Sequence, residues 1–309
     1  MKEIELFLSK CETNKIVIED LEKISNSNLP WDKLKNKKIA VTGGTGFLAT
    51  YFIKSLLTAN KKYDLNLDIF CVARDRRKFK KIYRRWITFN KLYFFQQDFC
   101  KDLRSDFPKV DYLIHSASNA SPKFYGINPV QTFLPNIMGT VQILKNIFSK
   151  KCNTFLFFSS GSIYGLQPKI LNSISENDYG ILDPHDLRSS YSLSKKMAEN
   201  ICIGWAKEYG VDTRIVRPFH TYGPGINLDD GRVFCDFVKN VVNKEDIVIK
   251  SDGLTKRCFC YLSDATIGFL TVLLKGEANN AYNIANPSQE ITVYDLAVLL
   301  ANLRKDISL

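Results

Sequence analysis

Apolar and polar positions alternate along this chain in a pattern that predicts a regular succession of strands and helices. From residue 38 onward, short apolar runs rich in β-branched and aromatic residues are separated by longer segments with apolar residues at helical spacing. Strands are expected at 38–42, 66–73, 91–96, 110–115, 154–159 and 213–217, and helices at 46–59, 76–85, 129–149 and 190–208. Strands separated by helices are joined by right-handed crossovers, which predicts an α/β fold with a parallel sheet and helices on both faces.

Two regions depart from this pattern. Residues 1–36 are polar and helix-prone, and they are expected to form an N-terminal helical extension packed beside the first strand. Residues 221–309 begin as an irregular segment rich in Gly, Asp and Asn. The expected organisation is a core over 37–220, with returning segments near 261–285, and a smaller lobe formed mainly by 221–309. Such a lobe closes over the carboxyl ends of the strands, where open α/β sheets bind ligands.

A glycine-rich turn joins the first strand to the first helix. It reads Gly43-Gly44-Thr45-Gly46-Phe47-Leu48-Ala49, which has the form Gly-x-x-Gly-x-x-Ala. Glycines there let the backbone approach a pyrophosphate, and the first N–H groups of the next helix face the anion. An ordinary glycine-rich strand–helix turn is the alternative, but the position at the start of the alternating pattern favours a dinucleotide site. We therefore expect a Rossmann-type doubly wound sheet with the NAD(P)-binding residues Gly43, Thr45, Gly46, Phe47 and Leu48.

The end of the second strand bears on the choice between NAD and NADP. An acidic residue there accepts hydrogen bonds from the adenosine ribose of NAD, whereas an arginine accommodates the 2′-phosphate of NADP. Here the strand ends in Arg74, followed by Asp75. Arg74 slightly favours NADP, and NAD stays open because a shift of one residue would put Asp75 in the place of the acid. Asp98 and Phe99 follow the third strand and are expected near the adenine, with a strand-end turn as the alternative role of Asp98.

Tyr191 and Lys195 lie four residues apart on a predicted helix and therefore share one face. The Lys195 ammonium is expected to lower the pKa of the Tyr191 phenol, which makes the phenolate a base that can take a proton from a sugar hydroxyl. The sugar carbon that bears this hydroxyl would yield hydride to a nicotinamide. Ser160 ends a preceding apolar strand, where its hydroxyl can bond the same substrate oxygen. Chance spacing on an amphipathic helix and strand-end turn chemistry are the alternatives.

Charge narrows the classes of partner. The chain has 309 residues, of which 45% are hydrophobic, and a formal net charge of +11 that suits an acidic ligand. Much of this charge lies in a basic run at 74–85. A solvated helix face, recognition of a cofactor phosphate and a nucleic-acid patch are three interpretations of the run. Because no nucleic-acid-binding motif accompanies it, we predict no nucleic-acid partner.

Cysteines and apolar runs exclude further classes. The eight cysteines are scattered, form no Cys-x-x-Cys motif and are accompanied by only three histidines, so free thiols and no metal site are expected. No run approaches the roughly 18 uncharged apolar residues of a membrane span, and the N-terminus lacks a secretory apolar segment. We therefore predict a cytoplasmic protein with no membrane partner.

Five short motifs are distributed along the chain. They are Thr-Gly-Gly-Thr-Gly-Phe-Leu at 42–48, His-Ser-Ala-Ser at 115–118, Ser-Ser-Gly-Ser-Ile-Tyr-Gly at 159–165, Tyr-Ser-Leu-Ser-Lys at 191–195 and Arg-Pro-Phe-His-Thr-Tyr-Gly-Pro at 217–224. Together they resemble the extended short-chain dehydrogenase/reductases, and within them the NAD-dependent epimerase/dehydratase family of nucleotide-sugar enzymes. Three more stretches are similar to the UDP-glucuronate decarboxylase branch, namely Ala-Ser-Pro-Lys-Phe-Tyr at 120–125, Asp-Asp-Gly-Arg-Val at 229–233 and Lys-Arg-Cys-Phe at 256–259.

This resemblance, which runs from about residue 37 to the end, implies roles for the matching residues. Tyr191 would be the base, Lys195 its electrostatic partner, and Ser160 the hydroxyl beside them, with Tyr191 and Lys195 also touching the cofactor. Further cofactor contacts are implied for Ser116, Ala117, Ser118 and Pro218. Contacts to a nucleotide-diphosphate sugar are implied for Ser121, Asn136, Ser162, His220, Arg232 and Arg257, the arginines on its diphosphate or uridine side. The helices at 129–149 and 190–208 would pair across a homodimer.

Departures from the family pattern bear on the reaction. Relatives that decarboxylate or dehydrate carry a carboxylic acid after the catalytic serine or threonine, whereas this chain has Gly161 and Ser162, neither of which can act as an acid or a base at neutral pH. All of these enzymes are expected to oxidise the sugar C4 hydroxyl to a 4-keto intermediate, and a 4-epimerase needs no further acid. We therefore expect a 4-epimerase first, a decarboxylase second and a 4,6-dehydratase third. His220 stands where the family usually has Asn, which alters the substrate-phosphate contact.

Two non-enzymatic functions are the remaining alternatives. A regulator that senses NAD(P) would keep the glycine-rich turn but would tend to lack the pair Tyr191 and Lys195, which this chain retains. A nucleic-acid-binding protein is favoured only by the basic run at 74–85, and its binding would weaken steeply with salt.

Overall fold

Strands and helices alternate from residue 38 onward, as the hydrophobic pattern predicted. The computed structural model describes residues 2–150, 152–167 and 173–304. The strands of the central sheet are β1 (Lys38–Thr42), β2 (Asp68–Ala73), β3 (Leu92–Gln96), β4 (Tyr112–His115), β5 (Thr154–Phe158), β6 (Thr213–Pro218) and β9 (Ala281–Ile284). The helices around it are α3 (Phe47–Tyr63), α4 (Arg76–Ile82), α5 (Pro129–Lys150), α6 (Ser190–Tyr209) and α8 (Leu262–Lys275).

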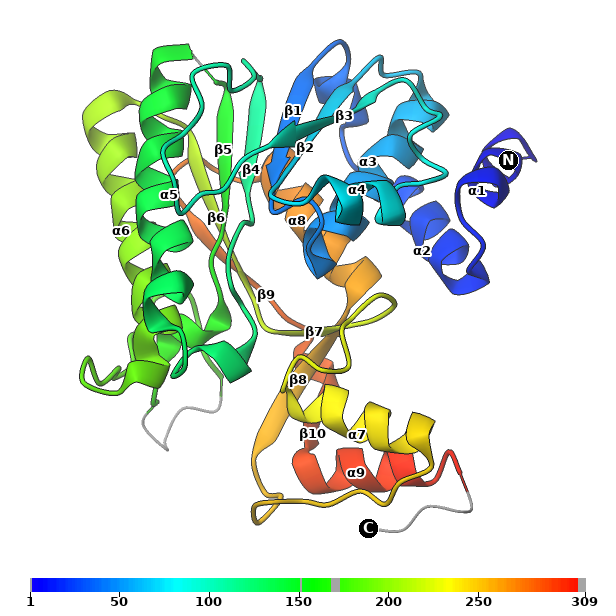
Figure 1. The fold of residues 1–309 in the computed structure, drawn as a ribbon, viewed down its shortest axis with the longest axis vertical. Helices are drawn as coiled ribbons and strands as arrows, with labels where there is room; N and C mark the ends of the chain where they lie inside the picture. Colours follow the sequence, from blue (N-terminus) through cyan, green and yellow to red (C-terminus); the bar gives the residue numbers. More distant parts are fainter. Residues whose placement is uncertain (1, 151, 168–172, 305–309) are drawn as a thin grey trace.

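The seven strands form one parallel sheet in the order β3-β2-β1-β4-β5-β6-β9 (Figure 1). The chain adds β2 and β3 outward on one side of β1 and then returns to place β4 on its other side. The switch point of the topology therefore lies between β1 and β4, where a doubly wound sheet opens a crevice at its carboxyl edge. The predicted Rossmann-type doubly wound sheet is confirmed.

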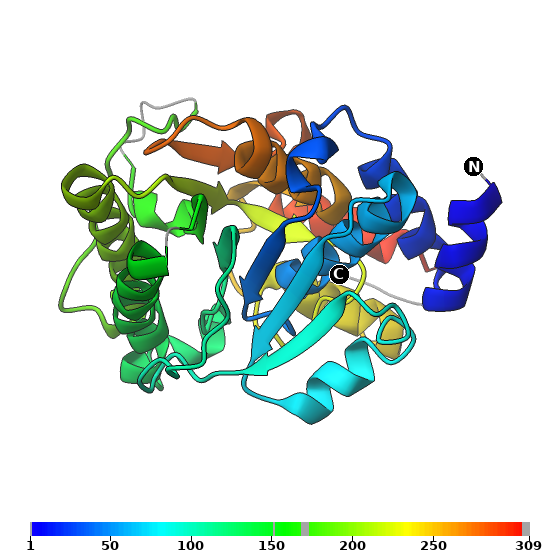
Figure 2. The same ribbon diagram turned by 90° about the horizontal axis from the view of Figure 1, so that it is seen from above.

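Helices cover both faces of the sheet (Figures 1 and 2). On one face Phe155 and Phe157 pack with apolar residues of α5 and α6. On the other face their neighbours Leu156 and Phe158 pack with residues of α3 and α8. Because side chains alternate between the two faces of a strand, a strand buried on both faces has to be apolar throughout. This explains the unbroken apolar run at 155–158.

A smaller lobe, defined here as β7 (His220–Tyr222), α7 (Val233–Asn243), β8 (Lys256–Tyr261), β10 (Glu290–Thr292) and α9 (Val293–Ala301), lies beyond the carboxyl edge of the sheet (Figure 1). Its three strands form a separate sheet in the order β10-β8-β7. Helices α7 and α9 pack together around their own apolar cluster, which includes Phe237 and Leu296. Between β8 and β10 the chain returns to the central sheet through α8 and β9.

The N-terminal residues form the helices α1 (Lys2–Cys11) and α2 (Lys15–Ser25). We expected them beside the first strand, but α2 packs on α3 and α8, and α1 packs on α2 and α3. The reason is that β1 lies inside the sheet, between β2 and β4, so that only the helices covering that face are accessible. Leu8, Leu21 and Ile24 thereby join the apolar cluster of the α3–α8 face.

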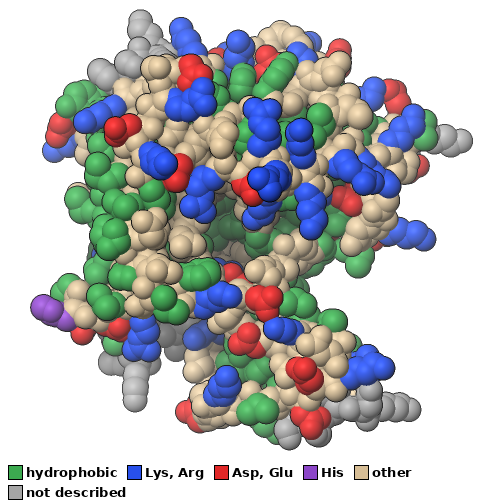
Figure 3. Space-filling model, in the orientation of Figure 1, with side chains coloured by type: hydrophobic (Ala, Val, Ile, Leu, Met, Phe, Trp, Pro, Cys, Tyr) green, Lys and Arg blue, Asp and Glu red, His purple; other side chains and the backbone are tan. Residues whose placement is uncertain are grey.

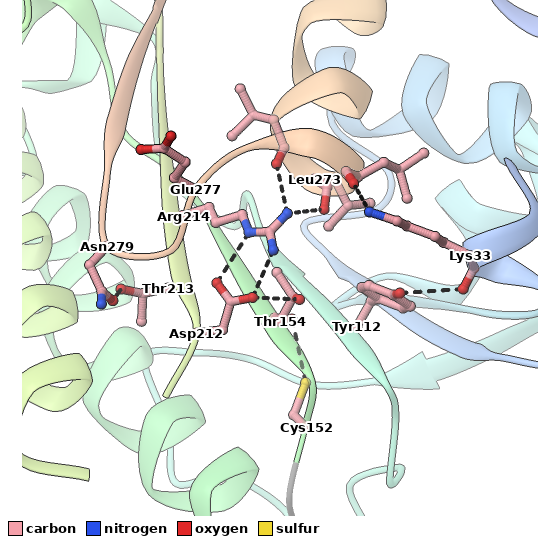
Figure 4. A network of polar contacts seen from close by, with 12 residues as sticks. Lys33, Tyr112, Cys152, Thr154, Asp212, Thr213, Arg214, Leu273, Glu277 and Asn279 are labelled. Carbon is pink, nitrogen blue, oxygen red and sulfur yellow. Dashed lines mark hydrogen bonds and ion pairs between the residues drawn. The ribbon is translucent and has the colours of Figure 1, made fainter. Parts of the chain in front are cut away.

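Polar contacts hold the end of α8 at the amino edge of the sheet, away from the carboxyl ends of the strands (Figure 4). The Arg214 guanidinium donates to the carbonyl of Leu273 at 2.6 Å and pairs with the Asp212 carboxylate at 2.8 Å. Lys33 Nζ donates to the carbonyl of Leu274 at 2.7 Å. The last carbonyls of a helix have no partner within the helix, and cations satisfy them while matching the negative end of its dipole.

Helix boundaries differ from the sequence prediction by a few residues. Helix α3 runs on to Tyr63, past the expected end at residue 59, and stops where Asp64 adopts a left-handed conformation. Helix α4 ends at Ile82, before the expected end at residue 85. Terminal residues of helices are set by local capping contacts, which apolar spacing does not record.

Candidate active site

A cavity of about 950 Å³ opens where the carboxyl ends of β1, β4 and β5 meet the smaller lobe. This volume lies at the upper end of the range for small-molecule sites. Figure 3 shows the surface hollowed between the part that holds the central sheet and the part that holds α7 and α9. Predicted residues from both parts line the cavity: Gly43, Gly46, Phe47, Leu48, Ser116, Ser118, Ser121, Ser160, Ser162, Tyr191, Lys195, Pro218, His220, Arg232 and Arg257.

The glycine-rich turn lies against the strand end of β4. Gly43 has φ +64°, and a Cβ atom placed on it would lie 2.8 Å from the Ala117 Cα atom. The Gly46 N–H donates to the Gly43 carbonyl at 2.7 Å, and α3 begins directly after Gly46 without a capping side chain. The first N–H groups of α3 are therefore available to an anion, and the turn provides the close backbone approach that a pyrophosphate requires.

Replacing Gly43 with alanine is expected to destabilise the fold by about 2 kcal/mol, because a residue with a side chain is strained at positive φ and its Cβ collides with backbone. Dinucleotide affinity should fall with it. Urea unfolding and titration with NAD+ measure the two effects. Gly204→Ala is the matched control, because a Cβ there meets no atom within 4 Å and α6 should gain about 1 kcal/mol. Equal stability of the two variants would contradict this role of Gly43.

His115 fixes the backbone opposite the turn through a buried set of hydrogen bonds. Its Nε2 lies 3.3 Å from the Pro135 carbonyl, and its Nδ1 lies 2.7 Å from the Thr42 hydroxyl. A carbonyl only accepts, so Nε2 carries the proton and Nδ1 accepts from Thr42. The Thr42 oxygen in turn accepts from the N–H groups of Ser116 and Ala117, at 3.2 Å and 3.1 Å. A neutral imidazole thus holds the two strand ends together.

Burial, together with the nearby Lys195 charge, lowers the pKa of His115 to about 3. In the unfolded chain a histidine titrates near pH 6.5, so below that pH the unfolded state binds the additional proton. Between pH 7 and pH 5 the free energy of unfolding should therefore fall by about 2 kcal/mol on account of this residue. Urea unfolding at both pH values should show a correspondingly smaller fall in His115→Asn. The exposed His185, changed to Asn, is the control and should leave the fall unchanged.

At the end of β2 the Asp75 carboxylate is already hydrogen-bonded, and the nearby cation that lines the cavity is Lys78 of the following helix. Asp75 caps α4, where its Oδ1 accepts from the N–H groups of Arg77 and Lys78 at 2.7 Å and 3.1 Å. These backbone hydrogen bonds lower the pKa of Asp75. The Arg74 side chain is exposed, while Lys78 lines the cavity. The predicted interpretations of the basic run at 74–85 did not single out Lys78.

Some predicted binding residues lie outside the cavity lining. Asp98 accepts from the Cys100 N–H at 3.0 Å, which is the turn contact considered as its alternative role. Phe99 is buried in the core, with its ring 5.4 Å from that of His115. Asn136 is buried between α5 and α6, where its amide donates to the Ser194 hydroxyl at 3.0 Å. The lining also leaves out Thr45, Arg74, Asp75 and Ala117.

Tyr191 and Lys195 meet the end of β5 inside the cavity. The Tyr191 ring stacks on that of Tyr125, with centroids 4.7 Å apart and planes at 4°. Lys195 Nζ lies 5.9 Å from the Tyr191 ring centroid and donates to the Phe158 carbonyl at 2.6 Å. The helical spacing therefore brings the two side chains to one face as expected, and the ammonium is additionally anchored to the strand that leads to Ser160.

The electrostatics of this pair differ from the expectation. Burial raises the pKa of Tyr191, while a hydrogen bond from Ser160 and the charge of Arg232 oppose the rise. Burial also lowers the pKa of Lys195 to about 7. From the sequence we expected the Lys195 ammonium to lower the pKa of Tyr191, but both groups lie in the interior, where burial disfavours the charged form of each.

Hydroxyl groups surround the phenol. Ser160 accepts from the N–H and the hydroxyl of Ser162, at 3.1 Å and 3.0 Å. In the described part of the chain, the buried hydroxyls of Ser118 and Ser159 have no hydrogen-bond partner although both residues line the cavity. Buried polar groups without partners are rare in proteins, and here both belong to the cavity that the glycine-rich turn also lines. These residues fit a polar dinucleotide ligand.

Cationic side chains from the lobe form the wall of the cavity that faces the central sheet. Arg257 and Arg232 both line the cavity and, after burial, lower the pKa of His220 to about 4, because a second positive charge beside them is unfavourable. His220 is therefore neutral at pH 7, with its ring packed on Phe259. Two guanidinium groups and an uncharged imidazole that can donate a hydrogen bond form a wall suited to phosphate oxygens.

The lobe is bonded to the core beside this wall. Ser121 Oγ donates to the Asp230 carbonyl at 2.7 Å, and Arg232 donates to the Ala120 carbonyl at 2.9 Å. Arg232 also pairs with the Asp230 carboxylate at 2.8 Å. Among the lining residues that the structure describes, Asp230 has the only carboxylate. From the sequence, the motif at 229–233 was expected to contribute Arg232 to the site. Nothing within the motif indicates that Asp230 also reaches the cavity.

A buried ion pair positions the catalytic segments. Arg217 on β6 pairs with Glu199 on α6 through two contacts, at 2.7 Å and 3.0 Å. The same guanidinium donates to the Tyr164 hydroxyl at 2.7 Å, and Tyr164 donates to Asn283 Oδ1 at 2.6 Å. Removing one partner of such a pair leaves an uncompensated buried charge, so Arg217 and Glu199 each require the other. It ties the helix of Lys195, the turn after β5 and strand β9 together.

The described residues contain neither a cluster of potential metal ligands nor a helix suited to span a membrane. There, no three His, Cys, Asp or Glu side chains are grouped closely enough to hold a metal ion. All eight cysteines are free thiols. Within the same residues, no helix combines the length and apolar character needed to cross a bilayer.

Comparison with known proteins agrees with this site. The model of the NAD dependent epimerase/dehydratase family matches residues 39–285. UDP-glucuronic acid decarboxylase 6 of Arabidopsis thaliana is 32% identical over 271 residues, which cover 87% of this chain and 75% of that protein. Two solved structures share the fold. UDP-glucose 4-epimerase of Thermotoga maritima with UDP-glucose has a TM-score of 0.71 at 21% identity, covering 88% and 85% of the two chains.

The second solved structure is the dTDP-glucose 4,6-dehydratase DesIV of Streptomyces venezuelae with NAD bound, with a TM-score of 0.72 at 22% identity over 86% and 80% of the chains. The family match spans the glycine-rich turn, the Tyr191–Lys195 helix and the return of the chain to the central sheet, and it confirms the resemblance seen in the motifs. This chain belongs to the NAD dependent epimerase/dehydratase family and is an enzyme of its nucleotide-sugar branch.

Proposed function

We propose that this enzyme oxidises the C4 hydroxyl of a nucleotide-diphosphate sugar to a 4-keto intermediate and reduces it again as a 4-epimerase. The observation that carries this proposal is the position of the Tyr191 phenol, which faces the same cavity as the glycine-rich turn and the two lobe arginines. The cavity of about 950 Å³ extends from the glycine-rich turn to the lobe arginines, so that a dinucleotide at one end and a sugar nucleotide at the other would meet at this phenol. That arrangement places the sugar between the sheet and the lobe.

Three side chains of the core would take part in the proton transfer. Tyr191 would take the proton of the C4 hydroxyl, with the Ser160 hydroxyl hydrogen-bonded to the same oxygen. Lys195, in its charged form, would stabilise the phenolate. NAD(P)+, when bound at the glycine-rich turn, supplies the hydride acceptor and later the hydride donor. After the ketone has turned within the cavity, Tyr191 would return the proton to the C4 oxygen and complete the epimerisation.

The residues after Ser160 favour epimerisation over reactions that need a second acid. Gly161 has no side chain, and the Ser162 hydroxyl is engaged with Ser160 at 3.0 Å. The carboxylate of Asp230 is paired with Arg232. Elimination of water requires an acid beside the leaving hydroxyl, so dehydration is the least supported outcome.

Decarboxylation is the second candidate, and the relatives favour it. Curated proteins that match this chain at about 30% identity are named UDP-glucuronic acid decarboxylases. Lys78, Lys195, Arg232 and Arg257 all line the cavity, which would attract a sugar acid as well as a diphosphate. A β-keto acid formed by oxidation at C4 loses carbon dioxide without a dedicated acid, so the missing carboxylic acid after Ser160 does not exclude this reaction.

NADP is slightly favoured as the cofactor. Arg74 is exposed at the end of β2 and Lys78 lines the cavity, so both can meet an added phosphate. The carboxylate that would instead accept the ribose hydroxyls, Asp75, already accepts two N–H groups of α4. Relative affinities for NADP+ and NAD+, measured by calorimetry before and after Lys78→Ala, test this preference.

A homodimer would form through α5 and α6. These helices pack side by side on the outer face of the sheet (Figure 1) and expose Val130, Met138, Met197 and Ile203. Exposed apolar side chains on adjacent helices suit a second copy of the chain. Sedimentation of the wild type and of Met197→Glu tests this assembly.

Incubation with UDP, GDP, CDP and dTDP sugars, followed by mass spectrometry and chromatography, identifies the reaction. An isomer of unchanged mass with a new retention time supports 4-epimerisation. Loss of carbon dioxide supports the second candidate, and loss of water supports neither. If no sugar in the panel reacts while NAD(P)+ binds, the proposed reaction is wrong.

A further inference from the structure

One buried carboxylate of the N-terminal extension connects the two halves of the active site. Asp20 Oδ2 on α2 accepts a hydrogen bond from the Tyr51 hydroxyl at 2.6 Å and another from the Tyr261 hydroxyl at 2.9 Å. Asp20 is only 8% exposed. Hydrogen bonds to an ionised acceptor are shorter and about twice as strong as neutral ones. Because both donors converge on a single oxygen atom, their separation is set by that atom.

The two tyrosines belong to elements with different tasks. Tyr51 lies one turn into α3, the helix whose first residues, Phe47 and Leu48, line the dinucleotide side of the cavity. Tyr261 is the last residue of β8, the strand that carries Arg257. Its ring packs on Tyr222, which itself lines the cavity, with centroids 5.4 Å apart. Asp20 is thus hydrogen-bonded both to α3, which supports the proposed cofactor site, and to β8, which supports the proposed substrate site.

Other contacts bring the extension to α3 and to α8, the helix that begins directly after Tyr261. Glu12 pairs with Lys54 on α3 at 2.6 Å, with both side chains largely buried. Lys23 pairs with Asp264 in the first turn of α8 at 2.6 Å, with both side chains about half exposed. The extension therefore spans the junction between α3 and α8 through apolar packing, one buried ion pair and one exposed ion pair.

Burial and the hydrogen bond to Asp20 raise the pKa of both Tyr51 and Tyr261, so both hydroxyls remain protonated donors at neutral pH. Neither tyrosine is among the residues that line the cavity, so they reach ligands only through α3 and β8.

We propose that Asp20 is a positioning residue, which holds the dinucleotide helix and the substrate strand in register so that the N-terminal extension couples the binding of cofactor and nucleotide sugar. This inference rests on the proposed function for the identity of the second ligand. Its distinguishing consequence is a cross effect. A change at Tyr51, on the cofactor side, alters the affinity for the sugar nucleotide, and a change at Tyr261, on the substrate side, alters the affinity for the dinucleotide.

Binding of NAD+ and of UDP to the full-length protein, measured by calorimetry with each ligand alone and with the other present, tests the proposal. Tyr51→Phe is expected to weaken UDP binding roughly fivefold, and Tyr261→Phe to weaken NAD+ binding roughly fivefold, which is the lower end of typical coupling between sites. For each ligand, the affinity of the double variant should be no lower than that of the single variant that weakens its binding more, because both changes break the same link.

Tyr63→Phe is the matched control. Tyr63 also lies on α3 and donates to the extension, at 2.8 Å to the Ser25 carbonyl, but at the far end of the helix from the cavity. It loses the same hydroxyl and should leave both affinities unchanged. Cross effects that appear equally in Tyr63→Phe would show a general loosening of the extension and overturn the proposal.

The two proposals fail separately. If wild-type protein binds NAD+ but no UDP and turns over no nucleotide sugar, the proposed function is wrong, while the effect of Tyr261→Phe on NAD+ affinity still decides the role of Asp20. If the reaction is confirmed and Tyr261→Phe changes only UDP affinity while Tyr51→Phe changes only NAD+ affinity, the two sides are independent and the positioning role is wrong.

Discussion

Replacing Tyr191 with phenylalanine is expected to lower kcat by about 10³-fold, within the range that a positioned acid–base group contributes. Dinucleotide affinity should stay within about twofold of the wild type, because the ring that stacks on Tyr125 at 4.7 Å is retained and only the hydroxyl is lost. Initial rates with the active sugar nucleotide and calorimetry with NAD(P)+ measure the two quantities. A variant with full activity would remove Tyr191 from the mechanism.

Tyr125→Phe is the matched control for this experiment. Its ring forms the other half of the same stack, and its hydroxyl donates to the Ala120 carbonyl at 2.8 Å. Loss of one such neutral hydrogen bond costs about 1 kcal/mol, so kcat should fall by less than tenfold. If Tyr125→Phe were the inactive variant and Tyr191→Phe the active one, the base would be Tyr125.

Replacing Lys195 with methionine is expected to lower kcat about 100-fold. A unit charge 5.9 Å from the centroid of the Tyr191 ring contributes about 3 kcal/mol to the stability of the phenolate at an effective dielectric constant of 20, which corresponds to about 100-fold in rate. The acid limb of the pH–rate profile should therefore move to higher pH in the variant. Methionine retains most of the volume of the buried side chain, so the loss reports mainly the missing charge.

The pH profile of the wild type gives a second readout for Lys195. Because burial lowers its pKa to about 7, the charged form that stabilises the phenolate is present below that pH and is lost as the pH rises through it. The kcat/KM of the wild type should consequently decline above about pH 7, and this decline should be absent in Lys195→Met. Lys196→Met, the neighbouring residue on α6, is the control and should keep both the rate and the profile.

The site explains why one family supports several outcomes after a common first step. In the proposed mechanism, the residues that would transfer the proton, Tyr191, Lys195 and Ser160, belong to the core. The arginines that would bind an acidic nucleotide come from the lobe. The fate of the oxidised sugar depends on whether a further acid stands beside it, and Gly161 and Ser162 leave that place without one. The choice of reaction is thus set by short segments at the rim of the cavity and not by the fold.

Much of the fold was predictable because its signals are local. A strand buried on both faces must be largely apolar, as at 155–158, and such strands alternating with amphipathic helices allow few arrangements other than a parallel doubly wound sheet. The turn at Gly43 follows from the conformational freedom of glycine. The shared face of Tyr191 and Lys195 follows from the helical repeat. Each of these features involves residues within a few positions of one another.

The remaining features depend on residues that are distant in the sequence. Tyr125 stacks on Tyr191 across 66 positions, because α6 and the segment after β4 meet at the carboxyl edge of the sheet. Asn136, predicted to line the sugar pocket, is instead buried between α5 and α6, where only the packing of those helices determines its partner. The lowered pKa of Lys195, about 7, likewise results from burial, which the spacing of residues does not show.

The sequence by itself determined the class of fold, the phosphate turn and the family of chemistry, since local periodicity, glycine positions and short motifs encode all three. Only the tertiary structure decided which residues reach the cavity, how buried the catalytic charges are, and that Asp20 joins α3 to β8. The physical reason is that burial and long-range hydrogen bonds are properties of the packed chain. They arise when segments far apart in the sequence come together, as Asp20 and Tyr261 do, which are separated by 241 positions and whose oxygen atoms lie 2.9 Å apart.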